Sequence, residues 1–235
     1  EIPGAGHMVI NQGLIRMESG ALMNGSASNT VTVNRGASLE LYNLAPFAPT
    51  WSLILNDGAF FRGGTYNNTS TNISVWAGPV TLNGTAFMYG YSSSGMVNWT
   101  IAGDVSGTGR LVRTGTTSST LWLTGTNNTY SGGTIVSNGI LYAKYPGSLP
   151  GYNDGRLTVA ANGTLAIHAS EGNFGFTAAQ VRDLNLASSF LANNAVLSID
   201  TGSADLDCPH DWPNLMGLAK QGTNSLTLGG VNNNL

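Results

Sequence analysis

The densest group of side chains that could do chemistry lies near the C-terminus. The stretch from Asp200 to Trp212 reads DTGSADLDCPHDW and holds four aspartates, a cysteine and a histidine. Carboxylate oxygens are the ligands that Ca²⁺ prefers, but the spacing lacks the calcium-loop pattern, and a Cys and a His two residues apart do not complete a four-ligand zinc site. We therefore expect an acidic loop without a cofactor, in which the weak candidates for a structural calcium ion are Asp205, Asp207 and Asp211.

Catalytic groups are sparse elsewhere. Glycoside hydrolysis needs two carboxylates on either side of the scissile bond, whereas Asp57, Asp104 and Asp154 lie far apart in the sequence. The Gly-x-Ser-x-Gly nucleophile motif is missing, and His168 in LAIHA alternates to the exposed face of its strand. We expect no enzymatic activity, because a polysaccharide lyase or hydrolase would need a carboxylate or basic cluster assembled from distant parts of the chain.

The composition excludes several classes of partner. Only 9% of residues are charged and the formal net charge is −3, which leaves no basic surface for nucleic acid. No apolar run approaches the roughly 20 residues of a membrane span. The chain is instead rich in Gly, Asn, Thr and Ser, and its single cysteine excludes an intrachain disulfide. We interpret this composition as that of a secreted or cell-surface bacterial protein.

A short phrase recurs along the chain and indicates the architecture. A glycine is followed by one or two residues and then by a large apolar residue that opens an alternating run, at an average spacing of about 24 residues. This spacing favours the coils of a β-solenoid, with about three short strands per coil, over an antiparallel sandwich. The phrase begins at Gly20, Gly36, Gly58, Gly84, Gly109, Gly139 and Gly163.

One segment carries a family resemblance. Residues 103–143, GDVSGTGRLVRTGTTSSTLWLTGTNNTYSGGTIVSNGILYA, closely resemble the autotransporter-associated β-strand repeat of bacterial secreted proteins, and residues 217–235 match the start of a second copy. The resemblance implies a right-handed parallel β-helix and secretion. We therefore expect one all-β domain, 1–235, that is a fragment of a larger multidomain protein. The matching positions of the first copy are Gly109, Leu111, Arg113, Gly115, Leu121, Leu123, Gly125, Asn127, Tyr130, Gly132 or Gly133, Thr134, Gly139 and Leu141.

A single segment departs from the strand pattern. In FGFTAAQVRDLNLASSFL, Thr177 is followed three residues later by Gln180, which is the signature of a capping box at a helix start. Val181 and Leu184 would then share one buried face. The sequence predicts a short helical elaboration near 177–186.

The aromatic residues can be sorted by strand register. Trp51 and Trp99 alternate with core aliphatics and are expected inward, and Tyr130 belongs to a structural turn. Trp122 lies between Leu121 and Leu123 and is expected outward. The other aromatics expected on the outer surface are Trp76, Phe61, Tyr42 and Tyr142, with Tyr145 and Tyr152 in the loop KYPGSLPGYNDG.

Exposed flat rings on a rigid ribbed surface suit polysaccharide chains, because the C–H face of a sugar packs against an aromatic ring. The sequence therefore favours a non-catalytic carbohydrate-binding module, which resembles the β-helical xylan-binding modules attached to plant cell-wall enzymes, with a xylan-type β-glycan as ligand and further catalytic or repeat domains attached. The alternatives are a structural passenger or adhesin stalk, and a β-helical polysaccharide lyase or hydrolase. The predicted carbohydrate-binding residues are Trp122, Trp76, Tyr142, Phe61 and Tyr145.

Overall fold

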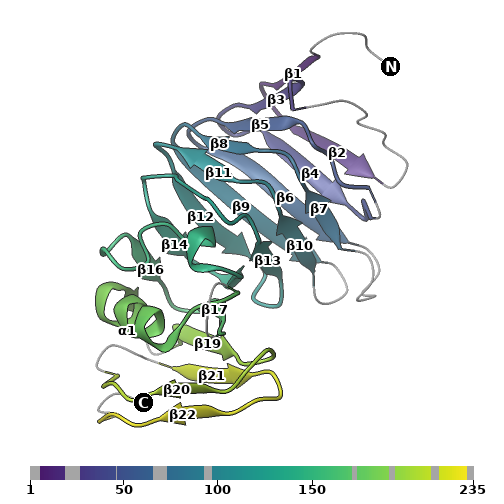
Figure 1. The fold of residues 1–235 in the computed structure, drawn as a ribbon. Coiled ribbons are helices and arrows are strands. Elements are labelled where there is room, and N and C mark those ends of the chain that lie inside the picture. The colour runs from purple at the N-terminus through teal and green to yellow at the C-terminus, as the bar shows by residue number, and fades with distance from the viewer. Residues whose placement is uncertain are drawn as a thin grey trace.

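The protein is a right-handed parallel β-helix, as the sequence predicts (Figure 1). Every strand pair that the structure describes is parallel and joins one coil to the next, as in the pairing of β13 with β15 and of β15 with β17. The first glycine phrase, at Gly20, and residues 232–235 of the second repeat copy lie outside the described residues. The computed structural model describes residues 6–18, 27–45, 47–65, 73–92, 97–170, 174–190, 194–212 and 217–231.

Three sheets run along the solenoid, and each coil contributes strands to them. Sheet A contains β1 (His7–Ile10), β3 (Thr30–Val33), β5 (Ser52–Leu55), β8 (Val80–Leu82) and β11 (Val105–Gly107). Sheet B contains β2 (Leu14–Glu18), β4 (Ser38–Tyr42), β6 (Ala59–Thr65), β9 (Thr85–Ser92), β12 (Arg110–Gly115), β14 (Thr134–Val136), β16 (Leu157–Val159) and β18 (Ser189–Phe190). Sheet C contains β7 (Ser74–Trp76), β10 (Asn98–Ile101), β13 (Thr120–Leu123), β15 (Gly139–Ala143), β17 (Gly163–His168), β19 (Val196–Asp200) and β21 (Leu218–Gln221). A further pair joins β20 (Leu206–Cys208) to β22 (Leu226–Leu228).

The core is built from side chains stacked in register inside the coils. The leucine that follows each turn in sheet C pairs with its counterpart one coil away, so that Leu121, Leu141, Leu165 and Leu197 form one fully buried row. Alternation then sends the intervening residues outward. The glycine phrases at Gly139 and Gly163 open two strands of this row, whereas the phrases at Gly36, Gly58, Gly84 and Gly109 open strands of sheet B.

Asparagines at equivalent turns stack in the same way. Asn34 donates its side-chain amide to Asn11 (2.7 Å), Asn56 donates to Asn34 (2.6 Å), and Asn83 donates to Asn56 (2.9 Å). A ladder of this kind satisfies the polar groups of neighbouring turns and fixes the register between coils.

The predicted helix is confirmed. Helix α1 (Ala178–Ala187) begins after Thr177, whose hydroxyl accepts from the Gln180 amide while Gln180 accepts in return from the backbone of Thr177. Val181 and Leu184 are buried, and the helix packs beside β20 (Figure 1). Within the described residues, no helix has the length and apolar character needed to cross a membrane.

Candidate functional site

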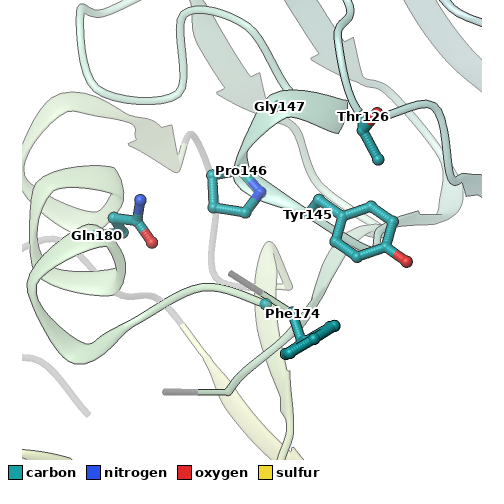
Figure 2. A pocket seen from close by; sticks show the side chains of 7 residues that line it. Thr126, Tyr145, Pro146, Gly147, Phe174 and Gln180 are labelled. Carbon is teal, nitrogen blue, oxygen red and sulfur yellow. The ribbon is translucent and has the colours of Figure 1, made fainter. Parts of the chain in front are cut away.

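A cleft of about 460 Å³ opens beside the C-terminal ends of β15 and β17 and next to helix α1 (Figure 2). Figure 2 shows the rings of Tyr145 and Phe174 on one side of this cleft and Pro146 and Gln180 on the other. The described residues that line it are Thr126, Tyr145, Pro146, Gly147, Phe174, Gly175 and Gln180.

Tyr145 is held by the short 3₁₀ turn that follows β15. Pro146 starts this turn (Pro146–Ser148) and fixes its backbone, while the Tyr145 amide donates to the Ser148 hydroxyl (3.2 Å). Ser148 in turn donates to the carbonyl of Gly125 in the previous coil (2.7 Å). The loop is thereby tied to the solenoid, and the aromatic ring has a fixed support.

Phe174 is the most exposed large apolar side chain among the described residues, with 74% of its surface accessible. Its loop returns to the sheet immediately afterwards, because the Phe176 amide donates to the His168 carbonyl (2.8 Å). Phe176 itself is buried and packs edge-on against Tyr152, with ring centroids 5.4 Å apart. The loop therefore buries one phenylalanine and presents the other to the solvent.

The wall opposite the rings comes from helix α1. Gln180 belongs to the capping box, and its Oε1 accepts from the Thr177 amide (3.0 Å). Burial raises the pKa of Tyr152, which lies next to Gln180. None of the described lining residues carries a carboxylate, imidazole or thiol. The cleft can therefore hold a neutral ring by stacking and by hydrogen bonds, but it offers no acid–base pair.

The orientation predicted for Trp122 is confirmed, since it points out from sheet C while Leu121 and Leu123 are buried. Its ring is half-buried because it packs on Tyr142 of the next coil, with centroids 3.8 Å apart and planes at 31°. Tyr142 also points out from sheet C, but only 6% of its surface is exposed. These two rings cover each other and leave little open face for a ligand.

Two of the predicted surface aromatics point inward instead. Trp76 and Phe61 are fully buried and pack edge-on, with ring centroids 5.7 Å apart. The prediction for Trp76 is wrong because β7 places Ser74 inward, where its hydroxyl accepts from the buried Leu44 amide (3.1 Å), and alternation then buries Trp76. Neither side chain can therefore stack on a ligand.

The prediction for Phe61 is wrong because the alternation in β6 is shifted by one residue from the expected one. Ala59 takes the inward place after the Gly58 turn, so Phe60 faces out and Phe61 faces in. On the outer face of sheet B, Phe60 stacks on Phe87 with centroids 4.9 Å apart. The small side chain of Ala59 was the signal that the sequence offered for this shift.

The outer face of sheet B also carries three tyrosines, of which the sequence predicted only Tyr42. Arg16 lies over the Tyr42 ring (4.4 Å from Cζ to the centroid), and Arg62 lies 5.0 Å from the centroids of both Tyr89 and Tyr91. The guanidinium groups occupy ring faces that a sugar would need. A cation also lies beside the Tyr145 ring, with Lys144 Nζ 5.1 Å from its centroid, so what distinguishes the cleft is the Phe174 ring, which is 74% exposed; we place the candidate site there for that reason.

Three further aromatics are buried, in agreement with their predicted structural roles. Trp51 and Trp99 are buried, as predicted. Tyr130 is also buried and shares a hydrogen bond with the Thr134 hydroxyl (2.7 Å). Burial raises the pKa of Tyr130, which keeps its hydroxyl neutral as a structural group.

Two carboxylates of the acidic stretch accept hydrogen bonds from the backbone of the next coil. Asp205 accepts from the Ser225 amide (2.7 Å), and Asp211 accepts from the Val231 amide (2.7 Å), so each carboxylate caps the following coil. Asp207 is exposed and Cys208 is buried. In the part of the chain that the structure describes, no three His, Cys, Asp or Glu side chains are grouped so as to hold a metal ion.

Comparison of the chain with protein-family models, with curated proteins and with solved structures finds no match.

Proposed function

We propose that this β-helix is a carbohydrate-binding module that holds one or two sugar units of a polysaccharide, with a xylan-type β-glycan as the best candidate, in the cleft beside helix α1. The observation that carries the proposal is the open cleft faced by Tyr145 and by Phe174, which is 74% exposed. A pyranose ring would stack its C–H face on these rings, while Thr126 and Gln180, which also line the cleft, would supply polar groups for its hydroxyls.

The size of the site sets the expected affinity. Each largely buried ring contributes about 1.5–3 kcal/mol. Two rings contribute about 3–6 kcal/mol before the cost of ordering the ligand is subtracted, so we expect a net binding free energy of at most about −4 kcal/mol, or a Kd in the millimolar range. This range suits a module that tethers attached domains to a polymer, where several weak contacts act together.

The resemblance of residues 103–143 to a repeat of secreted bacterial proteins supports an extracellular location and further domains on the same chain. It also supports the second candidate function, a rigid stalk of a passenger or adhesin protein. The observation that favours the stalk is the ladder of Asn11, Asn34, Asn56 and Asn83, which locks successive coils together.

Affinity electrophoresis separates the two functions. The protein would be run in gels containing xylan, mixed-linkage glucan, mannan, pectin or no polymer, and retardation in one of them is expected. Phe174→Ala and Tyr145→Ala should each weaken binding by about 10-fold or more, whereas Phe174→Trp should retain it. Phe87→Ala is the matched control, because it removes a half-buried phenyl ring from sheet B, away from the cleft. Migration unaffected by every polymer would favour the stalk.

Trp122→Ala belongs in the same experiment. Because Trp122 packs on Tyr142 rather than facing open solvent, we expect this variant to lose thermal stability and to keep its retardation. Loss of retardation at full stability would move the binding site from the cleft to sheet C.

A further inference from the structure

His168 meets Asp200 and Ser203, which are more than 30 residues away in the sequence, on the outer face of sheet C. The Ser203 hydroxyl lies 2.9 Å from Nε2 of His168, and Nδ1 of the same imidazole lies 3.7 Å from Oδ2 of Asp200. His168 ends β17, Asp200 ends β19, and Ser203 follows in the turn after β19. The parallel register of β17 with β19 places His168 directly opposite Asp200.

The order of these contacts is that of a nucleophile, a general base and an orienting carboxylate. Each nitrogen of the imidazole faces a different partner, so a proton bound to Nδ1 points to Asp200 and leaves Nε2 free to accept from Ser203. Contacts between such groups are often long in unliganded proteins, and the 3.7 Å separation falls within that behaviour. We propose that Ser203, His168 and Asp200 form an esterase-type catalytic triad.

The carboxylate is fixed from two further sides. Tyr142 donates its hydroxyl to Asp200 Oδ2 (2.6 Å), and the Gly202 amide donates to Asp200 Oδ1 (2.9 Å). These bonds orient Asp200 toward the imidazole. Tyr142 and Gly202 are positioning residues, whereas Ser203 is solvent-exposed and open to a substrate.

The reaction is acyl transfer from a carboxylic ester to water. Ser203 Oγ attacks the ester carbonyl as its proton passes to His168 Nε2, and the bond to the alcohol breaks as the alcohol leaves with that proton. Water then attacks the acyl-serine, giving its proton through His168 and releasing the acid and free Ser203. The neighbouring carboxylate disfavours anionic phosphoesters, so the substrate class is an uncharged ester. Because Ser203 is open to water, we expect slow turnover.

A link to the cleft suggests one source of such esters. The His168 carbonyl accepts from the Phe176 amide, which closes the loop that presents Phe174. We assign O-acyl groups on a polysaccharide held in the cleft as the substrates, an assignment that rests on the proposed function. The triad itself does not rest on it, since a small soluble ester tests the chemistry without the cleft.

The first test is covalent labelling with a biotinylated fluorophosphonate, followed by peptide mass spectrometry. We expect a phosphonyl group on Ser203 and no label on Ser203→Ala or on the heat-unfolded protein, while Ser131→Ala, which removes an exposed serine elsewhere, labels normally. Hydrolysis of p-nitrophenyl acetate should fall at least about 10-fold in Ser203→Ala, His168→Gln and Asp200→Asn. Thermal unfolding of each variant reports whether it is folded.

Folded wild-type protein that is neither labelled at Ser203 nor faster than buffer with p-nitrophenyl acetate would overturn the triad and leave a structural network. Labelling that persists in folded His168→Gln would overturn the role of the base. If labelling succeeds but Phe174→Ala still binds polysaccharide, the triad stands and the proposed cleft fails. The two proposals are thus distinguished by separate variants.

Discussion

The hydroxyl of Tyr142 donates a 2.6 Å hydrogen bond to Asp200, which lies two coils further along sheet C. The ring can bridge this distance because the outward position beside it in the intervening coil is Ala166, and the next is Ser198. Both of these small side chains are buried. One aromatic residue therefore lies along the sheet and joins three coils from outside, and Trp122 packs on its ring.

Tyr142→Phe should lower the free energy of unfolding by about 1–2 kcal/mol, because the variant keeps the packing of the ring and loses a hydrogen bond to a partly exposed carboxylate. Urea denaturation of the two proteins at neutral pH measures the difference. Tyr42→Phe is a matched control, since Tyr42 is half-buried on the outer face of sheet B, where it packs under Arg16. An equal effect of both substitutions would contradict the special role of the Tyr142–Asp200 bond.

Alkaline pH should destabilise the fold through its buried tyrosines. Burial, and then the Asp200 carboxylate, raise the pKa of Tyr142 above its ordinary value of 10.0, and burial does the same for Tyr130. The folded state thus binds these protons more tightly than the unfolded state, so the stabilisation is complete below pH 10 and is lost as the pH rises above it. The urea midpoint should fall between pH 9.5 and about 11, and less steeply in Tyr142→Phe. An unchanged slope in that variant would contradict this assignment.

The coil repeat, the helix and the leucine row could be predicted from the sequence because each depends on local spacing. The Thr177–Gln180 pair specifies the helix start within one turn, and the leucines that follow the turns at Gly139 and Gly163 pair in register. The sequence predicted less well whether a given aromatic side chain points into the core or toward the solvent. A one-residue shift at Ala59 reverses Phe60 and Phe61, and nothing in the strand pattern alone shows that Ser74 accepts a buried amide.

The candidate site was only partly predictable. Tyr145 was identified from its loop, but Phe174 belongs to a segment with no strand period, and its exposure depends on where Phe176 is buried. The contact between Ser203 and His168 spans 35 residues and exists only because β17 and β19 pair in one register. Such contacts follow from coil stacking, which a single sequence does not specify residue by residue.

Gly63 should not accept a side chain. It faces the inside of sheet B, and a Cβ atom there would fall on the indole of Trp99, 2.6 Å from Cδ1. Gly63→Ala should therefore cost about 2 kcal/mol or more through overpacking. A double-mutant cycle with Trp99→Leu checks the cause: the smaller side chain should make Gly63→Ala cheaper by about 1–2 kcal/mol. Strictly additive effects would show that the cost does not come from the Gly63–Trp99 contact.

Arg113 is the buried cation at the basic position of the repeat-like segment. Its side chain is fully buried inside sheet B and donates to the carbonyls of Met88 (3.3 Å), Ile140 (3.1 Å) and Ser119 (2.6 Å), as well as to the Ser119 hydroxyl. Burial lowers the pKa of Arg113 to about 10, which still leaves the group protonated at neutral pH. The planar fork thus joins β9, β15 and the turn before β13 through one side chain.

Arg113→Met should lower the free energy of unfolding by about 2–4 kcal/mol, because the methionine fills much of the volume but removes the side-chain donor from the Met88, Ile140 and Ser119 carbonyls, of which Ser119 keeps the Ile140 amide. Arg113→Lys should also be destabilising, since one ammonium group cannot reach all three acceptors from its flexible stem. Both values come from urea denaturation at neutral pH. Arg110→Met, at an exposed position in the same strand, is the matched control and should cost less than about 1 kcal/mol. If Arg113→Met were as stable as the wild type, the cost of burying the charge would equal the gain from its hydrogen bonds. The guanidinium group would then add nothing to the stability of the segments that it joins.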